Sequence, residues 1–479
     1  MEDSGGAGGH LGPGGGDGGA GRAARPPAGQ PGRTWIRRLA AGIGPDLALL
    51  RRSAEFRRLY AGQTWAFLGS SISFVGLPYQ AYQLTHSSLV VGLLSFAELV
   101  PLVATALLGG ALADAVDRRR LIRLCQLFLC GSGAALALNA AAWHQLWLLF
   151  LLAVLSTGLY GLQRPSLEAL VPVLVRRDEL PAAAALTGLL GNAVSLAGPL
   201  LGGVAIAAGG LPVAYLADSA ACVVALLAFS RMHATPPPPD AARPSLSSVR
   251  DGLRYARSRP ELLGTYLIDI CAMLFGAPYA LFPAIAARLG GPAVLGLLYA
   301  APAAGALIVS MTSGWTRHVS RHGRAIVLAV CGWGAGIVAF GFAPGLWWAV
   351  AALAAAGGAD MVSGIFRMTM WNQTIPASLR GRLAGLEMIS YTTGEPVGNL
   401  EAGLVASVTG SVRIAVVSGG VISVLGAVVV AAAVPMLWRF DARDHPGNPG
   451  LPPGHDPAPD EDPAPGEDPA PLSSGPAVP

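Results

Sequence analysis

The sequence consists largely of apolar segments, each long enough to cross a lipid bilayer as a helix, with most charges confined to the stretches between them. A helix needs about 20 mainly apolar residues to cross the hydrocarbon layer. Segments of about this length occupy residues 59–83, 89–112, 121–142, 146–170, 184–208, 212–232, 262–286, 293–313, 325–342, 346–370, 384–408 and 412–437. Backbone groups cannot stay unpaired in lipid. The sequence therefore predicts an all-α membrane protein with twelve transmembrane helices.

The composition excludes several other classes of protein. Hydrophobic residues make up 53% of the chain and charged residues 13%, whereas charged residues form about a quarter of a soluble domain. Every basic residue apart from histidine is Arg, and without Lys there is no phosphate-binding Gly-x-x-x-x-Gly-Lys motif. The five cysteines fall inside apolar segments without the spacing of a zinc site or a disulfide framework. We therefore expect no nucleic acid, no cofactor and no metal.

Two pairs of features recur at nearly the same distance along the chain. A charged loop at residues 109–120 has a counterpart at residues 313–324, about 204 positions later. Arg164 begins a run that ends at Pro172, and Arg367 begins a similar run about 203 positions later. Parallel repeats of this kind are typical of transporters built from two related halves. The twelve helices are therefore expected to form two pseudo-symmetric six-helix bundles.

The distribution of Arg predicts the orientation in the membrane, because cytoplasmic loops carry an excess of basic residues. Arg clusters alternate along the predicted loops, and the loops between these clusters hold only Arg288 and Arg413. Both termini are therefore expected in the cytoplasm of a multi-pass plasma-membrane protein. The expected parts are a disordered N-terminal segment, a first bundle, a linker with an amphipathic helix at 245–258, a second bundle and a disordered acidic tail, at residues 1–55, 56–232, 233–261, 262–440 and 441–479.

The loop after the second helix carries a motif of the major facilitator superfamily, which the chain resembles. Its matching residues are Gly110, Leu112, Asp114, Arg118 and Arg119, while Ala115 and Asp117 depart from the usual basic residue and Gly. The resemblance implies that Gly110, Asp114, Arg118 and Arg119 form a conformational switch.

A second motif lies in the fifth predicted helix, where Gly198, Pro199, Gly202 and Gly203 match the Gly-Pro-x-x-Gly-Gly of the family's antiporters. Pro199 removes one backbone hydrogen bond, and the glycines allow close approach of a neighbouring helix. This resemblance favours export. The chain as a whole is similar to the branch that holds the enterobactin exporter and macrolide and multidrug efflux proteins.

Carboxylates inside apolar helices are costly in lipid, which makes each a candidate functional residue. The candidates for proton or substrate binding are Glu98, Asp218, Asp269, Asp360 and Glu395. The alternative for each is a structural hydrogen bond or a position near a helix end. Glu98 lies deepest and favours its protonated form because its neighbours are apolar; Asp269 is the next candidate for the coupling carboxylate.

Three further charged residues are candidate partners in ion pairs. Arg164 and Glu168 lie one helical turn apart, and Arg367 lies two turns from Asp360 on the same helix face. The first spacing predicts a pair within one helix near the cytoplasmic surface, and the second predicts that Asp360 is the structural partner of Arg367.

These features together predict a secondary active exporter that exchanges protons for a small amphipathic molecule by alternating access. A drug, a siderophore and a biosynthetic product all remain open as substrates. The alternatives are a proton-coupled uptake symporter and, from another class, a non-transporting receptor or a membrane enzyme, which no catalytic cluster supports. The expected partners are the substrate, protons and lipid, and the expected oligomeric state is a monomer.

Overall fold

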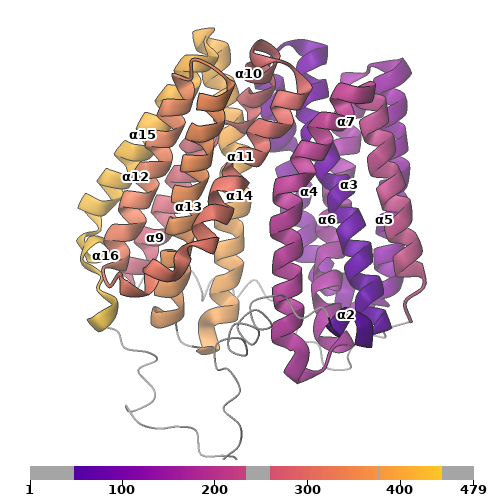
Figure 1. Ribbon diagram of the computed structural model, residues 1–479, viewed down its shortest axis with the longest axis horizontal. Helices are drawn as coiled ribbons and strands as arrows, with labels where there is room; N and C mark the ends of the chain where they lie inside the picture. Colours follow the sequence, from indigo (N-terminus) through magenta and orange to yellow (C-terminus); the bar gives the residue numbers. More distant parts are fainter. Residues whose placement is uncertain (1–47, 234–258, 376, 445–479) are drawn as a thin grey trace, which may run out of the picture. The chain divides into compact units, whose positions relative to one another are not determined.

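A computed structural model describes residues 48–233, 259–375 and 377–444, and the regular elements within these ranges are helices (Figure 1). Side chains are described outside residues 106–115 and 377–392. The predicted linker helix at 245–258, the N-terminal residues up to 47 and the tail from His445 lie outside the described residues.

The first half of the described chain is built from helices that contact mainly one another. They are α2 (Ala48–Arg52), α3 (Ala54–Thr85), α4 (Ser88–Ala115), α5 (Arg118–Leu138), the π-helical turn η1 (Asn139–Trp143), α6 (Leu146–Leu174), the 3₁₀ turn η2 (Arg177–Glu179) and α7 (Leu180–Ser230).

The second half repeats this pattern of long helices and short turns. It contains α9 (Pro260–Gly276), η3 (Tyr279–Leu281), α10 (Phe282–Leu289), α11 (Pro292–Met311), η4 (Ser313–His318), α12 (His322–Gly341), α13 (Leu346–Thr374), α14 (Ala377–Thr409), α15 (Val412–Ala433), α16 (Pro435–Arg439) and η5 (Ala442–Asp444). Nine segments of the described residues are long and apolar enough to cross a membrane.

Each predicted apolar segment has a helical counterpart, and one segment is divided between several shorter elements. The fifth and sixth segments lie in α7, where Gly210 interrupts the helix with a φ of 77° that favours Gly. The seventh segment was expected as one helix, which is wrong, because α9 ends at Gly276 and the chain turns through η3 into α10. Pro278 explains this break, since it disfavours helical geometry at the residue before it.

The described residues include a helix before the expected boundary at residue 55. Residues 48–52 form α2, and Leu49 is buried in a small core with Phe56 and Val175. This apolar contact stabilises α2, which lies inside the segment that was expected to be disordered.

Asp117, which departs from the family motif, is the N-cap of α5. Its Oδ1 accepts hydrogen bonds from the backbone N–H groups of Arg119 and Arg120, at 2.9 and 3.3 Å. An N-cap side chain satisfies donors that the first turn of a helix leaves unpaired. The departure therefore has a structural function, which is to start the third predicted membrane helix.

The two halves contact each other mainly through two pairs of helices, α4 with α14 and α7 with α11. A Cβ atom built on Gly203 of α7 would lie 2.9 Å from Cα of Gly296 in α11. One built on Gly92 of α4 would lie 2.9 Å from Cα of Leu400 in α14. These contacts lie near the starts of α4 and α11 and towards the end of α14, so glycines bring the halves together on one side.

Candidate functional site

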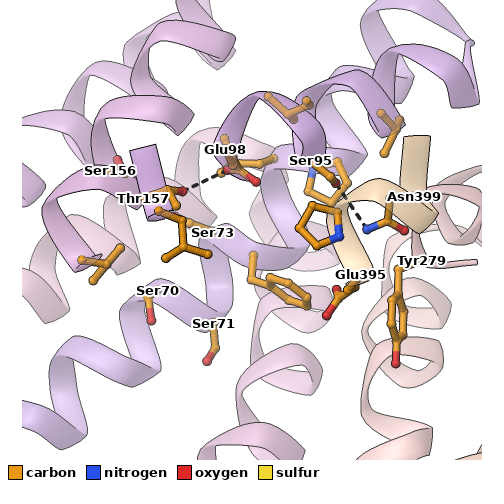
Figure 2. A pocket seen from close by; sticks show the side chains of 18 of the residues that line it. Ser70, Ser71, Ser73, Ser95, Glu98, Ser156, Thr157, Tyr279, Glu395 and Asn399 are labelled. Carbon is orange, nitrogen blue, oxygen red and sulfur yellow. Dashed lines mark hydrogen bonds between the residues drawn. The ribbon is translucent and has the colours of Figure 1, made fainter. Parts of the chain in front are cut away.

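A cavity of about 490 Å³ lies between the two halves of the chain. Residues of α3, α4, α5, α6 and α7 line it from the first half, and residues of η3, α11 and α14 from the second. Figure 2 shows Glu98 and Glu395 among its walls, on helices from opposite halves. A site of this kind is shared by both halves and changes when they move relative to each other.

Glu98 of α4 lies at the cavity wall, next to α6. Its Oε1 accepts a hydrogen bond of 3.3 Å from the hydroxyl of Thr157 (Figure 2). Among the described residues it forms no ion pair. The described partner of this carboxylate is thus a neutral hydroxyl, and no cation of the described residues pairs with it.

Glu395 and Asn399 of α14 lie one helical turn apart, and both line the same cavity. Asn399 accepts a hydrogen bond of 2.9 Å from the backbone N–H of Ala280, and its amide lies 3.5 Å from the hydroxyl of Ser95 in α4. Asn399 therefore joins α14 to the broken seventh segment and to the opposite half, which fixes the position of Glu395 beside the interface.

Asp218 of α7 is a third carboxylate of the lining, with 6% of its surface exposed. Ser73 of α3 donates a short hydrogen bond to its Oδ2, and the thiol of Cys222 lies 3.6 Å from its Oδ1. Both groups can donate to a carboxylate. This carboxylate is held between α3 and α7 within the first half.

Aromatic side chains form another part of the cavity wall. The rings of Tyr279 and Tyr299 stack at a centroid separation of 6.1 Å, and Phe74 packs edge-on against Tyr299 at 5.2 Å. The hydroxyl of Tyr299 donates to the backbone carbonyl of Tyr279 at 3.2 Å. Flat apolar faces next to carboxylates suit an amphipathic molecule with an aromatic part.

The lining contains three carboxylates and, among the described residues, no Arg, Lys or His. Its other polar groups are hydroxyls and the amide of Asn399. The rings of Tyr279 and Tyr299 can also attract a cation through their faces. The cavity therefore favours neutral or positively charged molecules and disfavours anions. The described residues contain no group of three His, Cys, Asp or Glu arranged to hold a metal ion.

The other two predicted carboxylates lie outside the lining of this cavity. Asp269 of α9 is buried and forms an ion pair with Arg367 of α13. The sequence predicted Asp360 as a charge partner of Arg367; the described ion pair of Arg367 is with Asp269 instead, and Arg367 acts on Asp360 at electrostatic range. Side chains two turns apart on the same helix are farther from each other than side chains that meet where two neighbouring helices pack.

Arg164 and Glu168 are the counterpart pair in the first half, and they form the ion pair that their spacing predicts. Arg164 Nε lies 2.9 Å from Glu168 Oε1 on α6, with both side chains more than half exposed. Arg367 is, in contrast, only 13% exposed. The two arginines thus occupy corresponding helices but lie in different environments, one at the surface and one in the protein interior.

The predicted switch residues lie at the junction of α4 and α5. Gly110 and Asp114 belong to the last turns of α4, where side chains lie outside the description. The guanidinium of Arg118 is buried and lies 3.4 Å from the carbonyl of Ala169, and that of Arg119 donates to the carbonyl of Ser230. Both arginines therefore connect α5 to the ends of neighbouring helices.

The four residues of the antiporter motif lie where α7 crosses other helices. Gly198 and Gly202 face α3, since Cβ atoms built there would meet Ser71 and Ile72. Gly203 faces α11 of the other half, and Pro199 is buried. The motif therefore provides close helix packing on two sides, one within the half and one between the halves.

Several lining residues did not emerge from the sequence, among them Asn399, Thr157, Ser73, Tyr279 and Tyr299. Isolated hydroxyls and aromatic rings are common in membrane helices, so they carry little signal alone. Asn399 was identifiable in principle, because an amide one turn after Glu395 marks a polar stripe on an apolar helix.

Comparison with known proteins identifies relatives along most of the chain. The profile of a family described as transmembrane secretion effector matches residues 46–452. The enterobactin exporter EntS of Shigella boydii is 30% identical over 398 residues, which cover 82% of this chain and 95% of the relative. The enterobactin exporter of Citrobacter koseri is 30% identical over 412 residues, covering 85% and 97%.

Solved structures with the same fold are more distant in sequence. A POT family transporter in complex with 5-aminolevulinic acid superposes with a TM-score of 0.63 at 10% identity, covering 80% of this chain and 97% of that one. The nucleoside transporter NupG gives a TM-score of 0.63 at 13% identity, covering 81% and 99%. The chain belongs to the transmembrane secretion effector family of the major facilitator superfamily and is a multi-pass membrane transporter.

Proposed function

We propose that this transporter exports a small amphipathic molecule, neutral or cationic, in exchange for protons. The observation that carries the proposal is the placement of Glu98 and Glu395, from opposite halves, in one cavity whose described lining has no basic side chain. The names of the relatives, which are exporters of enterobactin, support the direction of transport. The antiporter motif at Gly198 to Gly203 supports it as well.

Proton exchange follows from the cost of burying a charge. A carboxylate removed from water must be neutralised by a proton, a cation or strong hydrogen bonds. Glu98 has the Thr157 hydroxyl and no cationic partner among the described residues. A proton and a positively charged substrate then compete for the same charge, and this competition produces exchange. For a neutral substrate, protonation acts instead by changing which conformation is favoured.

The proposal is tested with three probes of similar size and different charge. Cells that express the protein are loaded with an aromatic ammonium compound, its neutral isostere and its carboxylate analogue, and retention of each is followed over time. We expect cells that express the protein to lose the ammonium compound and the neutral isostere faster than cells with an empty vector do. Selective loss of the carboxylate analogue would contradict the proposed substrate class.

Orientation decides which side the cavity faces. With both termini in the cytoplasm, the glycine contacts between the halves lie towards the outer surface. Cysteines placed at His86 and Gly345, in a variant without native cysteines, should react with an impermeant maleimide added outside whole cells. A cysteine at Ser320 should react only after the cells are opened. External labelling at Ser320 with protection at His86 would reverse the orientation.

Transport also requires the contacts between the halves to open and close. Gly203→Ala adds a methyl group where a Cβ would lie 2.8 Å from the carbonyl oxygen of Pro292 and 2.9 Å from Cα of Gly296. Overpacking costs about 1–3 kcal/mol, which shifts the equilibrium away from this closed contact by about tenfold or more. We expect at least a tenfold slower transport rate with normal membrane insertion.

The control for this prediction is Gly191→Ala, because a Cβ at Gly191 meets no atom within 4 Å. It lies on the same helix, so it controls for the lower conformational freedom of Ala. Equal transport rates in the two variants would argue against a conformational role for the contact.

The loop between α4 and α5 gives a further prediction. Asp114→Asn should leave membrane insertion intact and slow transport several-fold, because it removes a charge next to Arg118 and Arg119 without changing the cavity. Initial efflux rates and surface expression of Asp114→Asn are compared with those of the parent protein. Full transport in the variant would favour the alternative that this charged turn only determines orientation.

An uptake symporter remains the competing function. Symport requires proton and substrate to bind together, whereas one negative site shared by both favours exchange. The sign of the proton movement during transport therefore separates the two mechanisms.

A further inference from the structure

A second cavity, of about 480 Å³, lies at one end of the second half, away from Glu98 and Glu395. It is formed by η4, the loop after it, the start of α12, the end of α13 and η5. Four of its lining side chains are basic or can become so, namely Arg317, His318, His322 and Arg443. No Asp or Glu is part of its lining among the described residues. The cavity therefore favours a negatively charged occupant.

Two polar atoms of the lining are buried without a described hydrogen-bond partner. They are Nδ1 of His322, whose residue is 6% exposed, and Oε1 of Gln373. A buried polar atom without a partner costs free energy. The amide oxygen of Gln373 can accept from a backbone N–H, and a ring N–H of His322 can donate to a carboxylate. Both groups fit a peptide with acidic side chains.

The chain itself leaves the described region at the rim of this cavity. The backbone N–H of Ala442 donates to the carbonyl of Ser320 at 2.8 Å, and the Phe440 ring stacks on His322 at 6.3 Å. Ala442 and Arg443 are part of the lining. The residues that follow, from His445 onward, therefore start next to the cavity.

We propose that this basic cavity binds the acidic C-terminal tail of the same chain, residues 445–479. The tail contains six carboxylates and no Arg or Lys; the acidic residues are Asp456, Asp460, Glu461, Asp462, Glu467 and Asp468. Its repeated Asp-Pro-Ala-Pro sequence distributes these acids along the segment, and its Asp and Ala residues each have a backbone N–H that Gln373 can bind. Charge and chain connection both identify the tail as the occupant.

Tethering makes weak contacts sufficient for binding. Exposed ion pairs are individually weak, but a segment attached by a short flexible linker has an effective concentration in the millimolar range. Asp441 is not part of the described cavity lining; its Oδ1 accepts from the backbone N–H of Arg443 at 3.1 Å, and its charge acts on His322 at electrostatic range. The proposal does not depend on the substrate or the coupling ion of the transporter.

The test is photocrosslinking in the full chain, reconstituted in phosphatidylcholine nanodiscs. The photoreactive residue p-benzoylphenylalanine replaces Thr369 in the cavity wall, and a control replaces Trp347, which is 76% exposed near the start of the same helix. Crosslinked peptides are identified by mass spectrometry. We expect capture of peptides from residues 445–479 at position 369 and not at position 347.

Charge variants distinguish specific docking from chance contact. Replacing the six tail carboxylates with their amides, or combining Arg317→Gln with Arg443→Gln, should reduce tail capture about tenfold. Arg413→Gln, which removes an arginine stacked on Phe342 instead, should leave it unchanged. Unchanged capture in both sets of charge variants would overturn the proposal. Capture of phosphatidylglycerol in place of the tail, when this lipid is included, would also overturn it and assign the cavity to a lipid phosphate.

Discussion

Glu98→Gln is expected to abolish proton-driven efflux while substrate binding and downhill exchange continue. The amide has nearly the shape of the protonated acid but cannot release a proton, so it cannot complete a coupling cycle. Its contact with Thr157 is retained, because the amide oxygen can still accept the hydroxyl hydrogen. The cavity should therefore keep its form in this variant.

Efflux against a gradient and exchange at equal concentrations are measured with Glu98→Gln in the same membranes. Glu179→Gln in the loop turn η2 is the matched control, since Glu179 lies outside the cavity lining. It should transport like the parent protein. If Glu98→Gln still pumps substrate uphill, Glu98 is not the coupling site, and Glu395 and Asp218, the other carboxylates of the cavity, become the candidates.

The second large effect concerns the buried ion pair between Asp269 and Arg367. Arg367→Gln leaves the carboxylate of Asp269 buried without this guanidinium and beside a second acid, Asp360. Breaking a buried pair by removing one partner costs about 3–5 kcal/mol. We therefore expect a strongly lowered melting temperature of the purified protein.

The corresponding change in the first half provides the control. Arg164→Gln breaks a pair whose side chains are 54% and 67% exposed, and such pairs contribute about 0–1 kcal/mol. Adding Asp269→Asn to Arg367→Gln should recover much of the lost stability, because it removes the charge that was left behind. If the double variant loses as much stability as the sum of the losses in Arg367→Gln and Asp269→Asn, the two residues are not energetically coupled.

The helical fold was largely predictable, because lipid imposes one requirement on the sequence. Every spanning segment must pair its own backbone groups, so length and hydropathy are sufficient to locate helices. The exceptions have local causes. Pro278 breaks the seventh segment, and the burial of Leu49 against Phe56 and Val175 stabilises a helix inside the segment that was expected to be disordered.

The candidate site was predictable only in its rarest residues. Glu98, Asp218 and Glu395 are identifiable because carboxylates are costly in apolar helices. Their common cavity was not predictable, since it depends on the contact of α4 with α14, whose residues are about 300 positions apart. The pairing of Arg367 with Asp269 was missed for the same reason. Spacing along one helix reveals neighbours on that helix and not across helices.

The most direct test of proton-coupled export uses everted membrane vesicles, whose interior corresponds to the outside of the cell. Respiration makes the interior acidic, and ethidium serves as the probe because it is an aromatic cation. The proposed mechanism predicts ethidium accumulation in vesicles with the protein, abolished by collapsing the pH gradient and by Glu98→Gln. Accumulation that persists without the gradient, or that requires an alkaline interior, would contradict it.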